Sequence, residues 1–346
     1  MSQQLTIHIL SSVPYSNLNR DDSGTPKRIL HGGALRAVHS SQAIKRGARV
    51  AYQERTEDKA IRSGNHAEMV ANRAREINPS LDEAKAFKDA TELVKKLGKV
   101  TKENKTLSMF LSDEELESMA GAVAGGVADI EGSFDAYKTG SLAIAGFGRM
   151  FAEKDAKEFS VEAAVAVSPG VTTHAAQIST DYFTTVDDYG KQGATFLGVN
   201  QFTSGVFYRT VTIDKDQLRK SWTGLDSDRS VELLTAFIDS LLYAAPKGKK
   251  NSTNPYTMPA LVIAEEQKHR VAYDFETPVL ADETGGFVTP SVRALASQVK
   301  SSRHFDPSNF EGLFLAGGTY ADIESLLGTS ATKDEIIDAI VSWIKE

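Results

Sequence analysis

The chain has no cysteine among its 346 residues, which excludes disulfide bonds and thiolate metal sites. It also lacks any apolar run of the roughly 18–20 residues that a membrane-spanning helix needs, and its first residues do not have the pattern of a secretory signal peptide. The remaining composition, with 41% hydrophobic and 25% charged residues, is typical of a globular protein. We therefore expect a cytoplasmic protein that has no membrane association.

The chain also has fewer basic than acidic residues. The chain carries 39 Lys and Arg residues against 46 Asp and Glu residues, a net charge of −7. This acidic balance argues against a protein that binds polyanions over its whole surface, so any nucleic acid must meet a local basic region. The length allows one large domain or two modest ones, each with a substantial core.

One stretch reverses the acidic balance. Residues 17–49 carry seven Lys or Arg side chains against two Asp residues, a local net charge of +5, which leaves −12 for the rest of the chain. The stretch contains a glycine pair, Gly32-Gly33, that can let backbone approach a ligand. It also contains Ser40-Ser41, which can cap a helix whose free N–H groups suit an anion. These features predict a cradle for a phosphate backbone.

The N-terminal part of the chain predicts a strand and a helix followed by a helical insertion. The strand covers residues 5–10, a long ordered loop covers residues 14–39, and the helix covers residues 40–54, with Tyr52 on the same side as the basic residues. Residues 55–135 are polar and helical in character, with capping boxes that begin at Ser80 and Ser112. We interpret residues 55–135 as an insertion into a domain that contains β-strands.

The rest of the chain mixes strands and helices. We predict strands at residues 142–145, 171–179, 205–213, 260–264 and 270–276, the last two as a hairpin, and helices at residues 160–167, 227–245, 291–303 and 332–346. The simplest architecture with this order is an α+β fold, ferredoxin-like or similar to an RNA-recognition motif (RRM), with large insertions. Sheets of this kind often bind RNA across one face.

Several motifs in a shared order support a more specific interpretation. They are the basic stretch from Leu18 to Arg49, Gly148-Arg149-Met150, Thr172-Thr173-His174, residues 182–188 (YFTTVDD) and residues 202–209 (FTSGVFYR). Together they cover about residues 5–215. In this order they resemble the CasC-type backbone subunit of the type I-E CRISPR Cascade surveillance complex.

The resemblance implies a hand-shaped subunit. Its RRM-like palm corresponds to residues 1–54 and 136–346, its helical fingers to residues 55–135, and its β-hairpin thumb to about residues 178–206. Copies of such a subunit assemble along a guide crRNA, and each thumb kinks the RNA of the neighbouring copy, so that short runs of bases can pair with target DNA. The expected partners are crRNA, target DNA through the guide, further copies of the chain, and the large, small and guide-end-binding subunits of Cascade.

The resemblance also assigns roles to single residues. Met150 corresponds to an apolar wedge against the bases, and Phe183 lies in the thumb. The basic loop that contains Lys249 is either solvated or a further phosphate contact. The contacts to the RNA backbone are assigned to Arg20, Lys27, Ser40, Gln42, Lys45, Arg46 and Arg49.

Two other functions remain open from the residues alone, a metal-dependent ribonuclease and a solitary regulatory RNA binder. A ribonuclease would use acidic and histidine side chains, and the candidates are Asp21, Asp22, His31, His39, His66, Asp187 and Asp188. Adjacent Asp residues in a loop rich in Gly and Pro are more often turn formers. The Val-Asp-Asp pattern of the thumb matches the non-cleaving type of backbone subunit. We therefore expect no catalysis, no metal and no cofactor.

Overall fold

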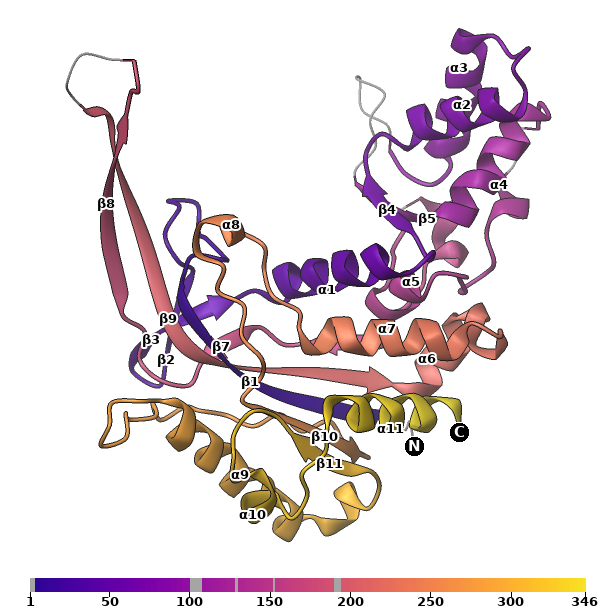
Figure 1. Cartoon of the computed structure of the whole chain (residues 1–346). Helices are drawn as coiled ribbons and strands as arrows, with labels where there is room; N and C mark the ends of the chain where they lie inside the picture. The colour runs from indigo at the N-terminus through magenta and orange to yellow at the C-terminus, as the bar shows by residue number, and fades with distance from the viewer. Residues whose placement is uncertain (1–3, 100–107, 128–129, 152, 190–193) are drawn as a thin grey trace.

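The computed structural model describes residues 4–99, 108–127, 130–151, 153–189 and 194–346. Its main sheet is formed by β1 (Gln4–Ser16), β2 (Arg28–His31), β3 (Ala34–His39), β6 (Val165–Val167), β7 (Gly170–Thr172), β8 (Ile178–Val186), β9 (Ala194–Asp214), β10 (Leu261–Gln267) and β11 (Phe314–Gly317). The strand order is β11-β10-β1-β9-β7-β3-β2, and both β6 and β8 pair with β9 (Figure 1). All of these pairs are antiparallel, so the predicted α+β class is confirmed.

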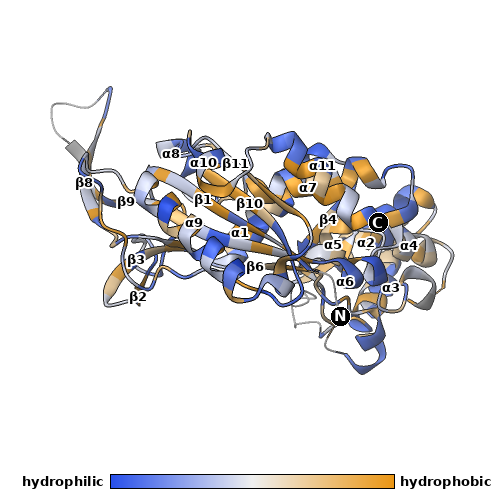
Figure 2. Cartoon of the chain, turned by 90° about the horizontal axis from the view of Figure 1, so that it is seen from below, coloured by the Kyte–Doolittle hydropathy of each residue, from blue (hydrophilic) through white to orange (hydrophobic). Residues whose placement is uncertain are grey.

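Helices cover both faces of this sheet. Successive side chains of the central strands point to opposite faces, so each face has its own apolar core. In β10, Val262 and Ala264 face one core and Leu261 and Ile263 face the other. Figure 2 shows that apolar residues are concentrated along these strands and on parts of the covering helices. The first core lies under α1 (Ser41–Arg55), α5 (Leu142–Phe147), α6 (Lys215–Ser221), α7 (Ser230–Leu242) and α11 (Lys333–Lys345), and the second under α9 (Val288–Phe305) and α10 (Ile323–Leu327).

A separate helical part follows α1. It consists of α2 (His66–Ile77), α3 (Glu83–Lys95), α4 (Asp113–Ala124) and a small sheet of β4 (Ala60–Ser63) and β5 (Met109–Ser112). The capping box at Ser112 is confirmed, because its hydroxyl accepts from Glu115 N at 3.1 Å and the Glu115 carboxylate accepts from Ser112 N at 2.8 Å. The apolar cluster of this part includes Phe151 and Phe159, which lie beyond residue 135. The boundaries of the predicted insertion stay a prediction.

A two-stranded arm extends from the main sheet on the opposite side (Figure 1). It is formed by β8 and the part of β9 that pairs with it, from Ile178–Thr203 to Val186–Ala194, and we call it the β8–β9 arm. The hairpin predicted near residues 178–206 is therefore present, while its tip at residues 190–193 lies outside the described residues. Its role as a thumb stays a prediction. Among the helices that the structure describes, none combines the length and apolar character that crossing a membrane requires.

Short apolar segments were the main source of wrong predictions. The predicted strand at residues 142–145 is helix α5, whose N-terminus is capped by Ser141 accepting from Ile144 N at 3.4 Å. The predicted helix at residues 160–167 contains β6, which pairs with β9. Periodicity cannot separate a buried helix from a buried strand over so few residues.

Three further predictions differ from the structure. The predicted loop at residues 14–39 contains the end of β1 and the β2–β3 hairpin, whose turn is formed by Gly32 and Gly33 at φ values of 57° and 72°. The predicted hairpin of residues 260–264 and 270–276 is absent from the described residues, because β10 pairs with β1 and β11 instead. Helix α3 is capped by Asp82 rather than Ser80, since Asp82 accepts from Lys85 N at 2.9 Å.

Candidate nucleic-acid interface

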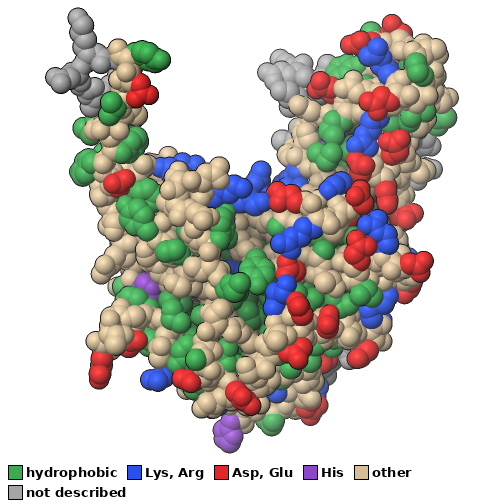
Figure 3. Space-filling model, viewed as in Figure 1, with side chains coloured by type: hydrophobic (Ala, Val, Ile, Leu, Met, Phe, Trp, Pro, Cys, Tyr) green, Lys and Arg blue, Asp and Glu red, His purple; other side chains and the backbone are tan. Residues whose placement is uncertain are grey.

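The molecule has a hollow between the β8–β9 arm and the helical part. Lys and Arg side chains gather on its floor, which α1 and the segment around α8 (Lys250–Thr253) form (Figures 1 and 3). We call the predicted backbone-contacting residues on and beside this floor the basic cradle, and its members are Arg20, Lys27, Ser40, Gln42, Lys45, Arg46, Arg49 and Lys249.

The start of α1 is held by the loop that carries Arg20 and Lys27. The Ser40 hydroxyl caps the helix by accepting from Ala43 N at 3.3 Å. The Ser40 N–H in turn donates to Asn19 Oδ1 at 2.7 Å, and Lys27 N donates to Asn19 O at 2.9 Å. Asn19 therefore brings the exposed side chains of Arg20 and Lys27 beside a helix N-terminus, where the helix dipole favours an anion.

The basic face of α1 continues from this N-terminus. Lys45 and Arg49 are half-buried, with Lys45 Nζ 5.9 Å from the ring centre of Phe147 and Arg49 Cζ 5.1 Å from that of Phe110. Burial lowers the pKa of Lys45. The pKa of Arg49 is lowered first by burial and then by the neighbouring charges of Arg46 and Arg62. The face is thus a group of cations that repel one another.

A third basic segment packs against the first two. Gly248 N donates to Leu18 O at 3.1 Å, and α1 approaches Ala245 so closely that a Cβ on Gly47 would lie less than 3.0 Å from the Ala245 carbonyl oxygen. These contacts bring residues 245–250 onto both the N-terminal loop and α1. Lys249 Nζ then donates to Asn200 Oδ1, which ties this segment to the base of the β8–β9 arm.

Arg62 is a basic residue of this surface that the sequence did not single out. It is exposed on β4, and its charge acts on Arg49. No local pattern marks it, because Arg62 lies in the helical part and meets α1 only through the tertiary fold.

Met150 projects next to this surface because Arg149 fixes the chain behind it. The Arg149 guanidinium is buried and binds Glu115 Oε2 at 2.5 Å, Phe159 O at 3.0 Å and Phe110 O at 3.4 Å. Phe110 is the residue whose ring Arg49 covers, so these contacts link Met150 to the middle of α1. The Met150 side chain itself is 84% exposed. An apolar side chain held out into solvent by a buried ion pair is not a core filler.

The arm presents aromatic and aliphatic side chains to solvent. Phe183 pairs in register with Gly198, and its ring covers the space that a Cβ on Gly198 would need. Phe183 remains 37% exposed, whereas its neighbour Tyr182 is 70% exposed. Tyr182 is therefore the more accessible of the two rings for contact with a nucleotide.

Some residues of the basic stretch have other roles. Arg36 is fully buried and donates to the carbonyl oxygens of Thr172 at 2.9 Å and Phe275 at 2.8 Å, so its charge is not at the surface. The glycine pair forms a hairpin turn, and Gly32 lies against the Glu276 backbone rather than an open ligand site. Tyr52, which was predicted on the same side of the helix as the basic residues, is buried in the first core.

Three of the candidate metal ligands have other positions or partners. Asp21 accepts from Ser23 N at 3.0 Å and from Thr25 Oγ1 at 2.6 Å, and hydrogen bonds from Thr25 and Ser23 lower its pKa to about 2. It is thus the turn former that the sequence also suggested. His39 and His66 are buried, and His66 Nε2 contacts Met109 O at 3.1 Å. Within the described part of the chain, no group of three or more His, Cys, Asp or Glu residues could hold a metal ion.

Comparison with known proteins identifies the family of the chain. The sequence model of the CT1975-like proteins, a Cas family, matches residues 5–343. The chain belongs to the CT1975-like family of Cas proteins. None of the curated proteins matches it by sequence.

Solved structures resemble this family member over almost its whole length. One is described as "CRISPR RNA-guided surveillance complex, pre-nicking", and the matching chain is 25% identical, with 99% of this chain and 100% of that chain covered and a TM-score of 0.83. Another, described as "CRISPR RNA-guided surveillance complex", is 22% identical over 98% of this chain and 99% of that chain, with a TM-score of 0.72, and supports the fold alone. Membership of a Cas protein family and a mixed α+β fold are therefore shown, while the CasC-type, type I-E assignment and the roles of single residues stay predictions.

Proposed function

We propose that the chain is a non-catalytic crRNA-binding backbone subunit of a type I-E CRISPR Cascade complex. The observation that carries this proposal is the convergence of three segments with Lys or Arg side chains, residues 18–27, α1 and residues 245–250, at one hollow. The family match and the similarity to a chain of an RNA-guided surveillance complex support the same function.

The basic cradle provides the contacts for a phosphate backbone. The charges of Arg46 and Arg62 act on Arg49 in an otherwise acidic molecule, and a bound phosphate relieves that repulsion. Phosphate contacts fix the position of an RNA without reading its sequence. The guide bases therefore stay free to pair with target DNA, which reads the sequence.

The exposed apolar side chains contact RNA in two ways, one within a copy of the chain and one between neighbouring copies. Met150 acts as a wedge at the end of the cradle and interrupts base stacking. The β8–β9 arm acts as a thumb that reaches over the RNA held by the neighbouring copy, with Tyr182 and Phe183 in contact with nucleotides. The palm of residues 1–54 and 136–346 and the helical fingers of residues 55–135 form the body of each copy. The large, small and guide-end-binding subunits complete the complex.

Salt dependence of RNA affinity tests the cradle. Five to seven phosphate contacts on single-stranded RNA give a slope of log K against log salt of roughly −3.5 to −5 per protomer. Replacing Lys45 and Arg46 by Ala removes two contacts, so the slope should weaken by about 1.4. Fluorescence anisotropy with two RNAs of unrelated sequence measures both slopes.

A matched control for this experiment lies on α9, which covers the other face of the sheet. Arg293 and Lys300 are exposed there, and replacing both by Ala removes the same charge. We expect this variant to keep the wild-type slope. Equal losses in the two variants, or a loss that depends on RNA sequence, would contradict the cradle.

The absence of catalysis and the assembly into a filament need separate experiments. Labelled RNA incubated with the protein and Mg²⁺ or Mn²⁺ should stay intact, and cleavage that is abolished by Asp21→Ala or Asp188→Ala would show a ribonuclease instead. Native mass spectrometry after co-expression with a CRISPR array should find several copies on one RNA. A single copy on a long RNA would indicate a solitary RNA binder.

A further inference from the structure

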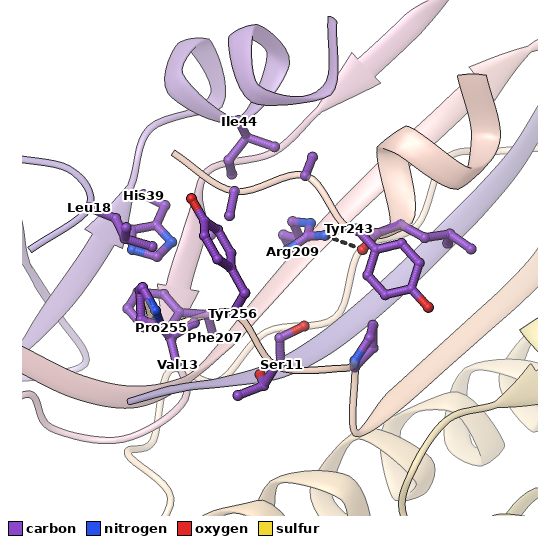
Figure 4. Close-up of a pocket in the computed structure, with 16 residues that line it drawn as sticks. Ser11, Val13, Leu18, His39, Ile44, Phe207, Arg209, Tyr243, Pro255 and Tyr256 are labelled. Carbon is purple, nitrogen blue, oxygen red and sulfur yellow. Dashed lines mark hydrogen bonds between the residues drawn. The ribbon is translucent and has the colours of Figure 1, made fainter. Parts of the chain in front are cut away.

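A small cavity lies beneath the floor of the basic cradle, between α1, strands β1 and β9, and the segment after α7 (Figure 4). Its volume is about 40 Å³, which exceeds the roughly 10–15 Å³ that one buried water requires. Ser11, His39, Arg209, Tyr256 and Thr257 contribute polar side chains to its wall. None of the described residues that line it is acidic.

Arg209 places an incompletely paired charge on this cavity. Its side chain is 8% exposed, and Nη2 donates to Leu242 O at 2.6 Å and Leu241 O at 3.3 Å. These carbonyls end α7, where the helix carries partial negative charge. Arg209 Nε has no hydrogen-bond partner among the described residues, and no carboxylate of that part of the chain lies within 4.0 Å of the guanidinium. A buried charge normally has an ionic or hydrogen-bonding partner for each of its groups.

The neighbouring side chains add hydrogen-bond donors. The His39 ring stacks on Phe207 with ring centres 4.2 Å apart. Burial and the charge of Arg209 lower the pKa of His39 to about 3, so the ring is neutral at pH 7 and carries one N–H donor. Ser11 and Tyr256 each add a hydroxyl group to the lining. The cavity therefore combines a fixed positive charge with donors that can turn toward a negative ion.

We propose that this cavity binds a small monovalent inorganic anion of the size of chloride, held by Arg209. The ion completes the charge balance that the end of α7 provides only in part, and it lies beside the guanidinium group, where no carboxylate of the described residues lies. The cavity is too small for a nucleotide, so the site is distinct from the basic cradle above it and does not depend on the proposed RNA binding. Residues 241–245 and 255–259 meet at this ion.

Bromide tests the proposal directly in crystals of the full chain. Crystals soaked in bromide in place of chloride should give an anomalous difference peak in the cavity, beside the Arg209 guanidinium group. An ordered water at that position, with no anomalous signal, would overturn the proposal. This measurement needs no variant, so it decides the question even where substitutions prevent folding.

Thermal melting tests the same site in solution. Chloride is replaced by gluconate at constant ionic strength, and the wild-type midpoint should fall by about 2 °C as a bound ligand is lost. Arg209→Met should abolish this chloride dependence. Arg36→Met is the matched control, because Arg36 is also a buried arginine but donates to several carbonyls and does not line the cavity. Equal chloride dependence in Arg209→Met and wild type would contradict the site.

Discussion

The same substitution in two helices should change the stability of this protein in opposite directions. Gly47 in α1 lies against the backbone of Ala245, and a Cβ there would come closer than 3.0 Å to the carbonyl oxygen and would have to displace backbone. Gly121 in α4 has no atom within 4 Å of the corresponding position. Gly47→Ala therefore tests the close approach of α1 to residues 245–250, and Gly121→Ala is its control.

The expected magnitudes differ enough to measure. Gly121→Ala gains about 0.5–1 kcal/mol from helix propensity alone. Gly47→Ala gains the same propensity but forces apart two packed segments, at a cost of about 1–3 kcal/mol or more for overpacking. A change of 1 kcal/mol corresponds to about 2–4 °C in a domain of 150–250 residues. We expect the thermal midpoint, followed by circular dichroism, to rise by about 1–3 °C for Gly121→Ala and to fall for Gly47→Ala.

RNA affinity provides a second measurement on the same pair. Displacement of residues 245–250 moves Lys249 away from the rest of the basic cradle, so Gly47→Ala should also weaken RNA binding, whereas Gly121→Ala should not. If both variants become more stable by the same amount, α1 and Ala245 are not in close contact, and the convergence of the three basic segments loses its main support.

Three further predictions concern the residues around this surface. Arg149→Met should destabilise the protein by about 3–5 kcal/mol in thermal melting because it leaves Glu115 buried without its partner; Glu115→Gln added to it should recover part of the loss, and no recovery would argue against the pair. Met150→Ala should change stability by less than about 0.5 kcal/mol because the side chain is exposed, whereas Phe151→Ala should cost about 3–5 kcal/mol; similar losses would place Met150 in the core. The folded-state pKa of His39 lies below its usual 6.5, so the unfolded chain gains a proton first as the pH falls toward 3 and stability decreases by up to about 1.4 kcal/mol per pH unit. His39→Phe should reduce the fall in melting midpoint between pH 7 and pH 5, and an unchanged fall would show that His39 is not the group responsible.

Local sequence signals correctly predicted the elements that are fixed by interactions between residues close together in the sequence. The helix of residues 40–54 was predicted correctly because Ser40 is a good N-cap and the apolar residues recur with a helical period. The predicted capping box at Ser112 is also present, and the last helix begins with another at Thr332. The segments at residues 142–145 and 270–276 were wrong because their structure depends on partners far along the chain. Leu142 and its neighbours are buried on all sides, and the strand that 270–276 would need as a partner is already paired.

The arginines of the candidate site also show that the sequence alone does not separate buried from exposed charges. Composition counts Arg36, Arg46 and Arg49 alike. Arg36, however, donates to backbone carbonyls in the interior, whereas on α1 Arg46 is exposed and Arg49 is half-buried. Conversely, Arg62 belongs to the basic surface although it lies outside the basic stretch. A charge is assigned to a surface or a core only by the long-range contacts that bury or expose it.

The placement of these charges explains how an acidic protein can offer a basic surface. Arg149 and Arg209 are buried and hold the chain behind the cradle, one through Glu115 and the other through the end of α7. Each fixes backbone whose neighbours are exposed, Met150 in one case and the segment leading to Lys249 in the other. The buried arginines thus position the apolar and basic groups of the hollow without adding to its surface charge. Substitutions of buried and exposed arginines should therefore separate: the first should lower stability, and the second should lower RNA affinity and weaken its salt dependence while leaving the melting midpoint nearly unchanged.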